Sequence, residues 1–122
     1  MDADLRRIVI VDAHRRRSGA VARRVHSLGT GETFQFEPAP DGFRDITSGM
    51  LVRIDGNRIL LPDGRGPINL SLVGDVGFDG VVLDDKEPFS GRAGGGNSVT
   101  LYDRHGKDYF QFAVVTDDGP VQ

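Results

Sequence analysis

The sequence predicts one domain of the α+β class, mainly β, in which a single N-terminal helix packs on antiparallel β-sheets. Its 122 residues are enough for one hydrophobic core and too few for two. The 17 glycines gather in short, turn-like strings, which are typical of a chain with many short strands. The first 28 residues contain no proline and no glycine string. We therefore expect a single globular domain over residues 1–122, with a helix segment over 1–28 and a β-rich head over 29–122.

The segment 4–28 is expected to be helical because it lacks proline and is followed by Gly29, a common residue just past a helix. In its second half, four residues fall on one helical stripe that should face the core: Ser18, Val21, Val25 and Leu28. Two features leave alternatives open. Residues 8–11 are four consecutive β-branched residues, which resemble a buried strand. Ser18 can also cap a shorter helix over residues 19–28.

After Gly29 the hydrophobic period changes to that of strands, and about six to eight strands are expected. The string Asp55-Gly56-Asn57 predicts a hairpin between residues 50–54 and 58–61, and a second hairpin is predicted between 99–102 and 109–115. Residues 84–97 are rich in glycine and charge, so a long mobile loop is expected there. Further strands are predicted over 32–37, 68–73 and 80–83.

The net charge of −3 hides a strong asymmetry along the chain. Residues 1–28 carry seven arginines against three acidic residues, whereas residues 29–122 carry eight basic against fifteen acidic residues. A basic helix lying on an acidic sheet explains this division without a nucleic-acid partner. We therefore expect that the protein has no nucleic-acid partner.

No catalytic, cofactor-binding or metal-binding residue is predicted, and the protein is not expected to be an enzyme. The chain has no cysteine, and its three histidines lie far apart without metal-ligand spacing. Ser71 and Ser90 lack the GxSxG setting of a nucleophile. Acidic residues concentrate over 75–87, but their spacing is not that of an EF-hand, which favours a solvated loop over a calcium site. No apolar run approaches the length that spans a membrane.

Two partial resemblances imply a cytosolic signalling or ligand-binding domain. Residues 7–12 (RIVIVD) with the basic stretch after them, and residues 81–84 (VVLD), resemble the opening strand and the phosphoacceptor strand of response-regulator receivers. Ala13 stands where those domains carry an acidic magnesium ligand. Residues 69–74 (NLSLVG) fit the [DN]xSxxG half of the PilZ motif, whose RxxxR half is missing.

A third resemblance is to minor pseudopilin H of type II secretion and to related type IV pilins of the FimT kind. Residues 14–23 (HRRRSGAVAR) resemble the LRxARSxAVAR pattern at the end of their long helix. Residues 32–38 resemble their first strand, and residues 89–101 with 112–114 resemble their terminal block. The resemblance implies a non-enzymatic structural subunit with a pilin-like β-sandwich head, which assembles at the tip of a pseudopilus or pilus.

The same resemblance implies other minor pseudopilins or pilins as partners and no cofactor. The head would lie in the periplasm, and its only membrane contact would be an inner-membrane helix preceding residue 1; a cytoplasmic location is the alternative. Two groups of residues are expected at partner contacts, one on the helix and one on the loop over 84–97: Leu5, Ile8 and Val9, and Arg92, Gly94 and Gly95. Leu5, Ile8 and Val9 could equally face their own sheet.

Overall fold

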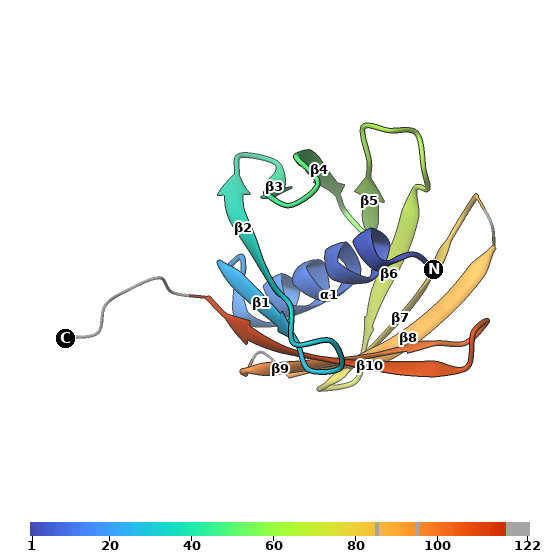
Figure 1. Cartoon of the computed structure of the whole chain (residues 1–122). Coiled ribbons are helices and arrows are strands. Elements are labelled where there is room, and N and C mark those ends of the chain that lie inside the picture. Colours follow the sequence, from blue (N-terminus) through green and yellow to red (C-terminus); the bar gives the residue numbers. More distant parts are fainter. Residues whose placement is uncertain (85, 95, 117–122) are drawn as a thin grey trace.

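The computed structural model describes residues 1–84, 86–94 and 96–116. In this part of the chain, ten antiparallel strands form a closed barrel around one helix, α1, which spans Ala3–Ser18 (Figure 1). The strands in chain order are β1 Arg24–Ser27, β2 Thr33–Ala39, β3 Gly42–Asp45, β4 Met50–Asp55, β5 Arg58–Leu60, β6 Ile68–Val73, β7 Gly77–Val82, β8 Glu87–Ala93, β9 Ser98–Asp103 and β10 Asp108–Val115.

The barrel has the simplest up-and-down order, because each strand pairs with the next one in sequence and β1 pairs with β10. Val25 of β1 lies opposite Val114 of β10 on one side and Phe34 of β2 on the other. The predicted pilin-like β-sandwich head is therefore wrong. A sandwich leaves the edges of two sheets unpaired, whereas here β1 closes one sheet on itself. β1 comes from the segment that was predicted to be helical.

Helix α1 begins and ends at conventional caps. The Asp2 carboxylate accepts a hydrogen bond of 2.9 Å from the Leu5 N–H. At the other end Gly19 has a left-handed φ of 81°, and its N–H donates to the Arg15 carbonyl at 2.8 Å. The prediction of a helix near the N-terminus is confirmed, but its extension to residue 28 is wrong. Ser18 ends the helix and does not cap a second one, and the predicted helical stripe does not exist.

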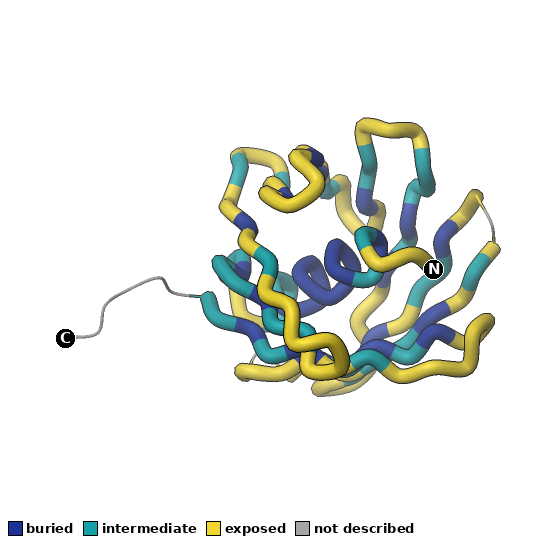
Figure 2. Tube along the Cα trace, viewed as in Figure 1, coloured by how far each residue is buried: buried dark blue, intermediate teal, exposed yellow. Residues whose placement is uncertain are grey.

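The helix runs through the inside of the barrel, which explains the run of four β-branched residues. Residues 8–11 are all 0% exposed, because strands surround the helix on every side (Figure 2). A helix that is apolar all round belongs in an interior. Its 16 residues extend about 24 Å, enough to pass along the barrel from one end to the other. The receiver-like interpretation of residues 7–12 as an opening strand is therefore wrong.

Polar contacts fix the helix at both ends of the barrel. Where the helix begins, Arg7 Nη2 lies 2.9 Å from Asp45 Oδ2 at the end of β3. Where it ends, Arg17 Nη2 donates to the Gly74 carbonyl at 2.8 Å and His14 Nε2 lies 2.9 Å from the Gly96 carbonyl. We call the first end of the barrel, with the β1–β2 and β9–β10 turns, the mouth, and the other end the base.

A charged residue of α1, Asp12, is fully buried inside the barrel. Asp12 is 0% exposed, and its two carboxylate oxygens each lie 2.8 Å from a guanidinium nitrogen of Arg15 or Arg16. Arg16 also donates to the Leu70 carbonyl of β6 at 2.5 Å. Because the buried carboxylate has two cationic partners, its desolvation is compensated within the helix itself.

The two predicted hairpins are confirmed, but the predicted long loop is wrong. Asp55 pairs with Arg58 across the β4–β5 turn, and Asp103 pairs with Asp108 across the β9–β10 turn. Within residues 84–97 the chain forms β8, whose Phe89 is 0% exposed and points into the core. β8 pairs with both β7 and β9, so this segment is an integral part of the barrel wall.

Within the described residues, no helix combines the length and apolar character needed to cross a lipid bilayer.

Candidate functional site

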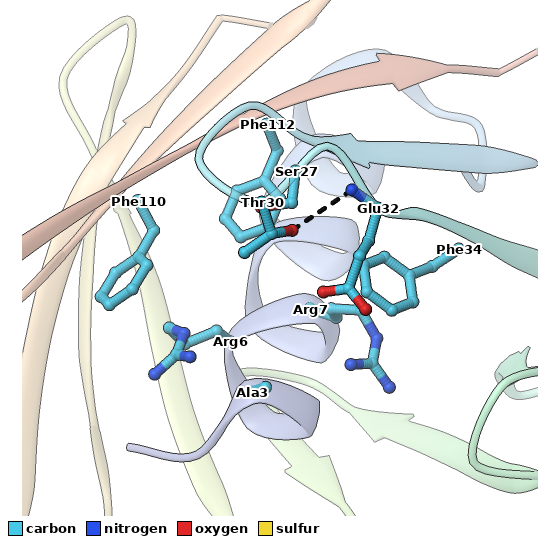
Figure 3. Close-up of a pocket in the computed structure, with 9 residues that line it drawn as sticks. All are labelled: Ala3, Arg6, Arg7, Ser27, Thr30, Glu32, Phe34, Phe110 and Phe112. Carbon is cyan, nitrogen blue, oxygen red and sulfur yellow. Dashed lines mark hydrogen bonds between the residues drawn. The ribbon is translucent and has the colours of Figure 1, made fainter.

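A pocket opens at the mouth of the barrel between the first turns of α1, the β1–β2 turn and the start of β10. Its cavity is about 80 Å³, which is room for several waters or one small organic group. Nine residues line it: Ala3, Arg6, Arg7, Ser27, Thr30, Glu32, Phe34, Phe110 and Phe112 (Figure 3). The mouth of a β-barrel is a frequent place for ligands. Because α1 fills the lumen behind it, a ligand could reach the mouth but not the interior.

Two arginines on consecutive positions of α1 reach opposite aromatic walls of this pocket. The Arg6 guanidinium carbon lies 4.0 Å from the ring centre of Phe110, and that of Arg7 lies 4.3 Å from the ring centre of Phe34 (Figure 3). Both contacts are cation–π interactions, which hold the guanidinium groups on ring faces. Phe112 is 4% exposed and adds a third apolar wall.

Arg7 is bound on one side only. Its Nη2 lies 2.6 Å from Asp4 Oδ1 and 2.9 Å from Asp45 Oδ2, so its charge is neutralised. The residue is 4% exposed, and its Nε has no hydrogen-bond partner. A buried N–H without a partner costs roughly 1–3 kcal/mol.

Arg6 has no acidic partner within the part of the chain that the structure describes. One of its nitrogens, Nη1, donates to the Met1 carbonyl at 2.5 Å. The rest of its planar group can donate to a ligand, and a guanidinium fits the two oxygens of a carboxylate particularly well. The pocket therefore contains one neutralised and one uncompensated arginine.

The β1–β2 turn supplies the remaining polar groups. Thr30 Oγ1 accepts a hydrogen bond of 3.2 Å from the Glu32 N–H. The Glu32 carboxylate itself forms no ion pair or hydrogen bond among the described residues, although it lines the same pocket as Arg6. In Figure 3 the Glu32 carboxylate and the Arg6 guanidinium stand on opposite sides of the pocket. The site thus presents a free anion and a free cation on facing walls.

A serine and a histidine meet at the base of the barrel, far from this pocket. Ser18 Oγ lies 3.3 Å from His14 Nδ1, and the other ring nitrogen of His14 contacts the Gly96 carbonyl at 2.9 Å. Burial lowers the pKa of His14, and the bond to Gly96 offsets part of that effect. The Ser18 hydroxyl is also bonded to both the N–H and the carbonyl of Ala20. These bonds hold it in the turn after α1, so the pair serves to end the helix.

The acidic residues over 75–87 do not converge where the structure describes them. Asp75, Asp79 and Asp84 are all exposed, and Asp85 lies outside the described residues. No group of three or more acidic or histidine side chains that could hold a metal ion is found in residues 1–84, 86–94 and 96–116.

The helix residues that were expected to contact partners lie inside the barrel. Leu5 is 3% exposed, and Ile8 and Val9 are 0% exposed. They pack on the molecule's own strands, so a partner could touch them only if α1 left the lumen. Their role in assembly stays a prediction that requires such a release.

Two of the other expected contact residues, Arg92 and Gly94, lie toward the base of the barrel. Arg92 is exposed on β8, opposite Gly77 and Thr100 on the neighbouring strands. Gly94 is exposed just after β8, and Gly95 lies outside the described residues. Neither Arg92 nor Gly94 lines the pocket at the mouth.

Sequence reasoning did not find the mouth pocket. The alternation of Phe110 and Phe112 along a strand was visible and indicated an inward face. Nothing in the sequence shows that this face meets Arg6, Arg7 and Glu32, because the three segments are brought together only when the barrel closes.

The fold and pocket define the protein as an up-and-down β-barrel with an internal N-terminal helix and a small polar and aromatic site at its mouth. No protein-family model, no curated protein and no solved structure matches the chain.

Proposed function

We propose that the protein is a non-enzymatic binding domain that holds a small carboxylate in the pocket at the barrel mouth. The observation that carries the proposal is the Arg6 guanidinium, which lines the cavity and has no acidic partner among the described residues. A carboxylate is the acceptor that this guanidinium lacks. This function belongs to the ligand-binding class that the partial PilZ resemblance of residues 69–74 also implies. The receiver resemblance adds no support, because residues 7–12 are helical.

The apolar walls support a carboxylate that carries a short hydrocarbon group. Phe34, Phe110 and Phe112 surround the charged groups, so the hydrocarbon part would bury its surface on them. The cavity of about 80 Å³ favours a small molecule, or the end of a larger one that extends out of the mouth. A low dielectric between the rings strengthens the bond from the Arg6 guanidinium to the ligand.

Binding of 3-methylbutanoate, measured by titration calorimetry or by NMR, tests the proposal. For a ligand of this size we expect a Kd on the order of 1 mM, which corresponds to about 4 kcal/mol. Arg6→Gln should weaken binding at least about tenfold, because it removes a charge-assisted hydrogen bond worth about 1.5–3 kcal/mol. Arg58→Gln is the matched control, since Arg58 is exposed on β5 and does not line the pocket.

Three results would contradict carboxylate binding at the mouth. They are no saturable binding up to tens of millimolar, equal loss of affinity in Arg6→Gln and Arg58→Gln, and unchanged affinity in Arg6→Gln. A thermal melt of each variant shows that it is folded before its affinity is compared.

Assembly with other minor pseudopilins or pilins is a second candidate function, and the specific observation behind it is the resemblance of residues 14–23 and 89–101. The barrel does not add to that support, since a pilin-like head is not the fold of the chain. In this candidate, the exposed Arg92 and Gly94 offer the accessible contact surface. Arg92→Glu should then weaken co-purification with such subunits. Unchanged co-purification would contradict a role of this surface in assembly.

A further inference from the structure

We infer that the ligand of the mouth pocket is a zwitterion, a small apolar amino acid whose ammonium group binds Glu32 while its carboxylate binds Arg6. This inference rests on the proposed function and specifies the ligand's chemical class. It starts from the two unpaired charges that line one cavity, a guanidinium on α1 and a carboxylate on the β1–β2 turn.

The charges of the pocket do not suit an anion alone. Arg7 is already neutralised by the buried Asp45 and by Asp4, so it offers no free charge. That leaves Arg6 and Glu32, which carry opposite charges and form no ion pair with each other among the described residues. A plain carboxylate would pair with Arg6 and leave Glu32 without a partner. A zwitterion satisfies both.

The polar groups near Glu32 suit a primary ammonium, which has three N–H donors. Glu32 offers two acceptor oxygens, and the Thr30 hydroxyl, which already accepts from the Glu32 N–H, has a further lone pair. Ser27 contributes another hydroxyl to the lining. A quaternary ammonium has no donor for these oxygens, so a primary amine is the better match.

The aromatic rings leave little free surface on which the cationic group of a ligand could bind. The Arg6 guanidinium lies on Phe110 and the Arg7 guanidinium on Phe34, so two of the three ring systems already bind a cation of the protein. Phe112 remains as the apolar wall for a ligand side chain. The small cavity restricts that side chain to a short hydrocarbon, as in alanine or valine.

Titrations with valine and its two truncated analogues test the inference. 3-Methylbutanoate is valine without the ammonium group, and isobutylamine is valine without the carboxylate. We expect valine to bind at least about tenfold more tightly than either analogue, because each lacks one charge-assisted hydrogen bond. In Glu32→Gln this advantage over 3-methylbutanoate should fall to about threefold or less. Glu37→Gln is the matched control, because Glu37 is exposed on β2 and does not line the pocket.

The outcomes separate the inference from the function on which it rests. If 3-methylbutanoate binds as tightly as valine and Glu32→Gln has no effect, the zwitterion is excluded while carboxylate binding stands. If isobutylamine binds as tightly as valine and Arg6→Gln has no effect, the ligand is a cation and both proposals fall. If none of the three ligands binds, both fall as well.

Discussion

Arg7 of the internal helix and Asp45 at the end of β3 form a buried ion pair, with Arg7 Nη2 2.9 Å from Asp45 Oδ2. Asp45 is 0% exposed and also accepts a hydrogen bond of 3.0 Å from the Thr47 N–H. The pair joins the helix to the barrel wall beside the mouth pocket.

Removing Asp45 should destabilise the fold strongly. Asp45→Ala leaves a buried guanidinium without its buried counter-charge, while the partly exposed Asp4 stays in place. We therefore expect the free energy of unfolding to fall by about 3 kcal/mol, the lower end of the range for breaking a buried ion pair. Chemical denaturation measures this change. Arg44→Ala is the control on the neighbouring position, since its side chain is 48% exposed and its pair with Glu37 is loose at 3.6 Å. That variant should cost less than about 1 kcal/mol. Equal losses of stability in the two variants would contradict a special stabilising role of the buried Arg7–Asp45 pair.

Gly91 cannot be replaced even by alanine without cost. An added Cβ would stand 2.2 Å from the Thr100 carbonyl oxygen and 2.3 Å from Cζ of Phe78, its cross-strand partner on β7. The backbone oxygen cannot move out of the way, so Gly91→Ala should lower the free energy of unfolding by at least about 1–3 kcal/mol. In Gly29→Ala the new methyl group meets open space. We expect a change within about 0.5 kcal/mol there. A neutral Gly91→Ala would contradict the close packing of Phe78 on β8.

The protein should lose stability as the pH falls below about 6.5. His14 is 1% exposed, and burial lowers its pKa below the ordinary value of 6.5. Below the ordinary pKa, the unfolded chain therefore binds a proton that the folded chain does not. The free energy of unfolding falls by at most about 1.4 kcal/mol for each pH unit, until the pH reaches the pKa of His14 in the folded protein. Denaturation between pH 5 and 8, a window taken around the ordinary histidine value, would measure the slope. In His14→Gln, the pH dependence of the free energy of unfolding that His14 causes below pH 6.5 should disappear. An unchanged dependence would show that another group causes it.

The sequence predicted the helix at the N-terminus but not where it ends, because two local signals competed. Gly29 and Gly19 both suit a position just past a helix, and the hydrophobic spacing of Val21 and Val25 fits a helix as well as it fits the approach to a short strand. Gly19 takes the left-handed conformation and ends the helix. Val25 then enters β1, because without this strand the barrel could not close between β10 and β2.

Strand β8 was not predicted from the sequence because its composition is typical of a loop. Its sequence contains Pro88 and Gly91, which favour a loop when read locally. In the barrel Gly91 is needed to make room for the Phe78 ring, so tertiary packing decides its place in a strand. The mouth pocket could not be predicted from the sequence for a related reason. It is formed by residues near positions 6, 32 and 110, and only the closed barrel brings those positions together.

Chemical-shift mapping by NMR tests the central claim most directly, namely that the mouth of the barrel is the binding site and its lumen is closed by α1. Labelling both the backbone amides and the arginine Nε–Hε groups allows the site to be located during a titration with valine. The account predicts saturable shifts at the Nε–Hε group of Arg6 and at the amides of Thr30, Glu32 and Phe112, with none at His14 or Gly74 at the base. Shifts centred on the base or on the outer strand surface, or no saturable shifts at all, would contradict it.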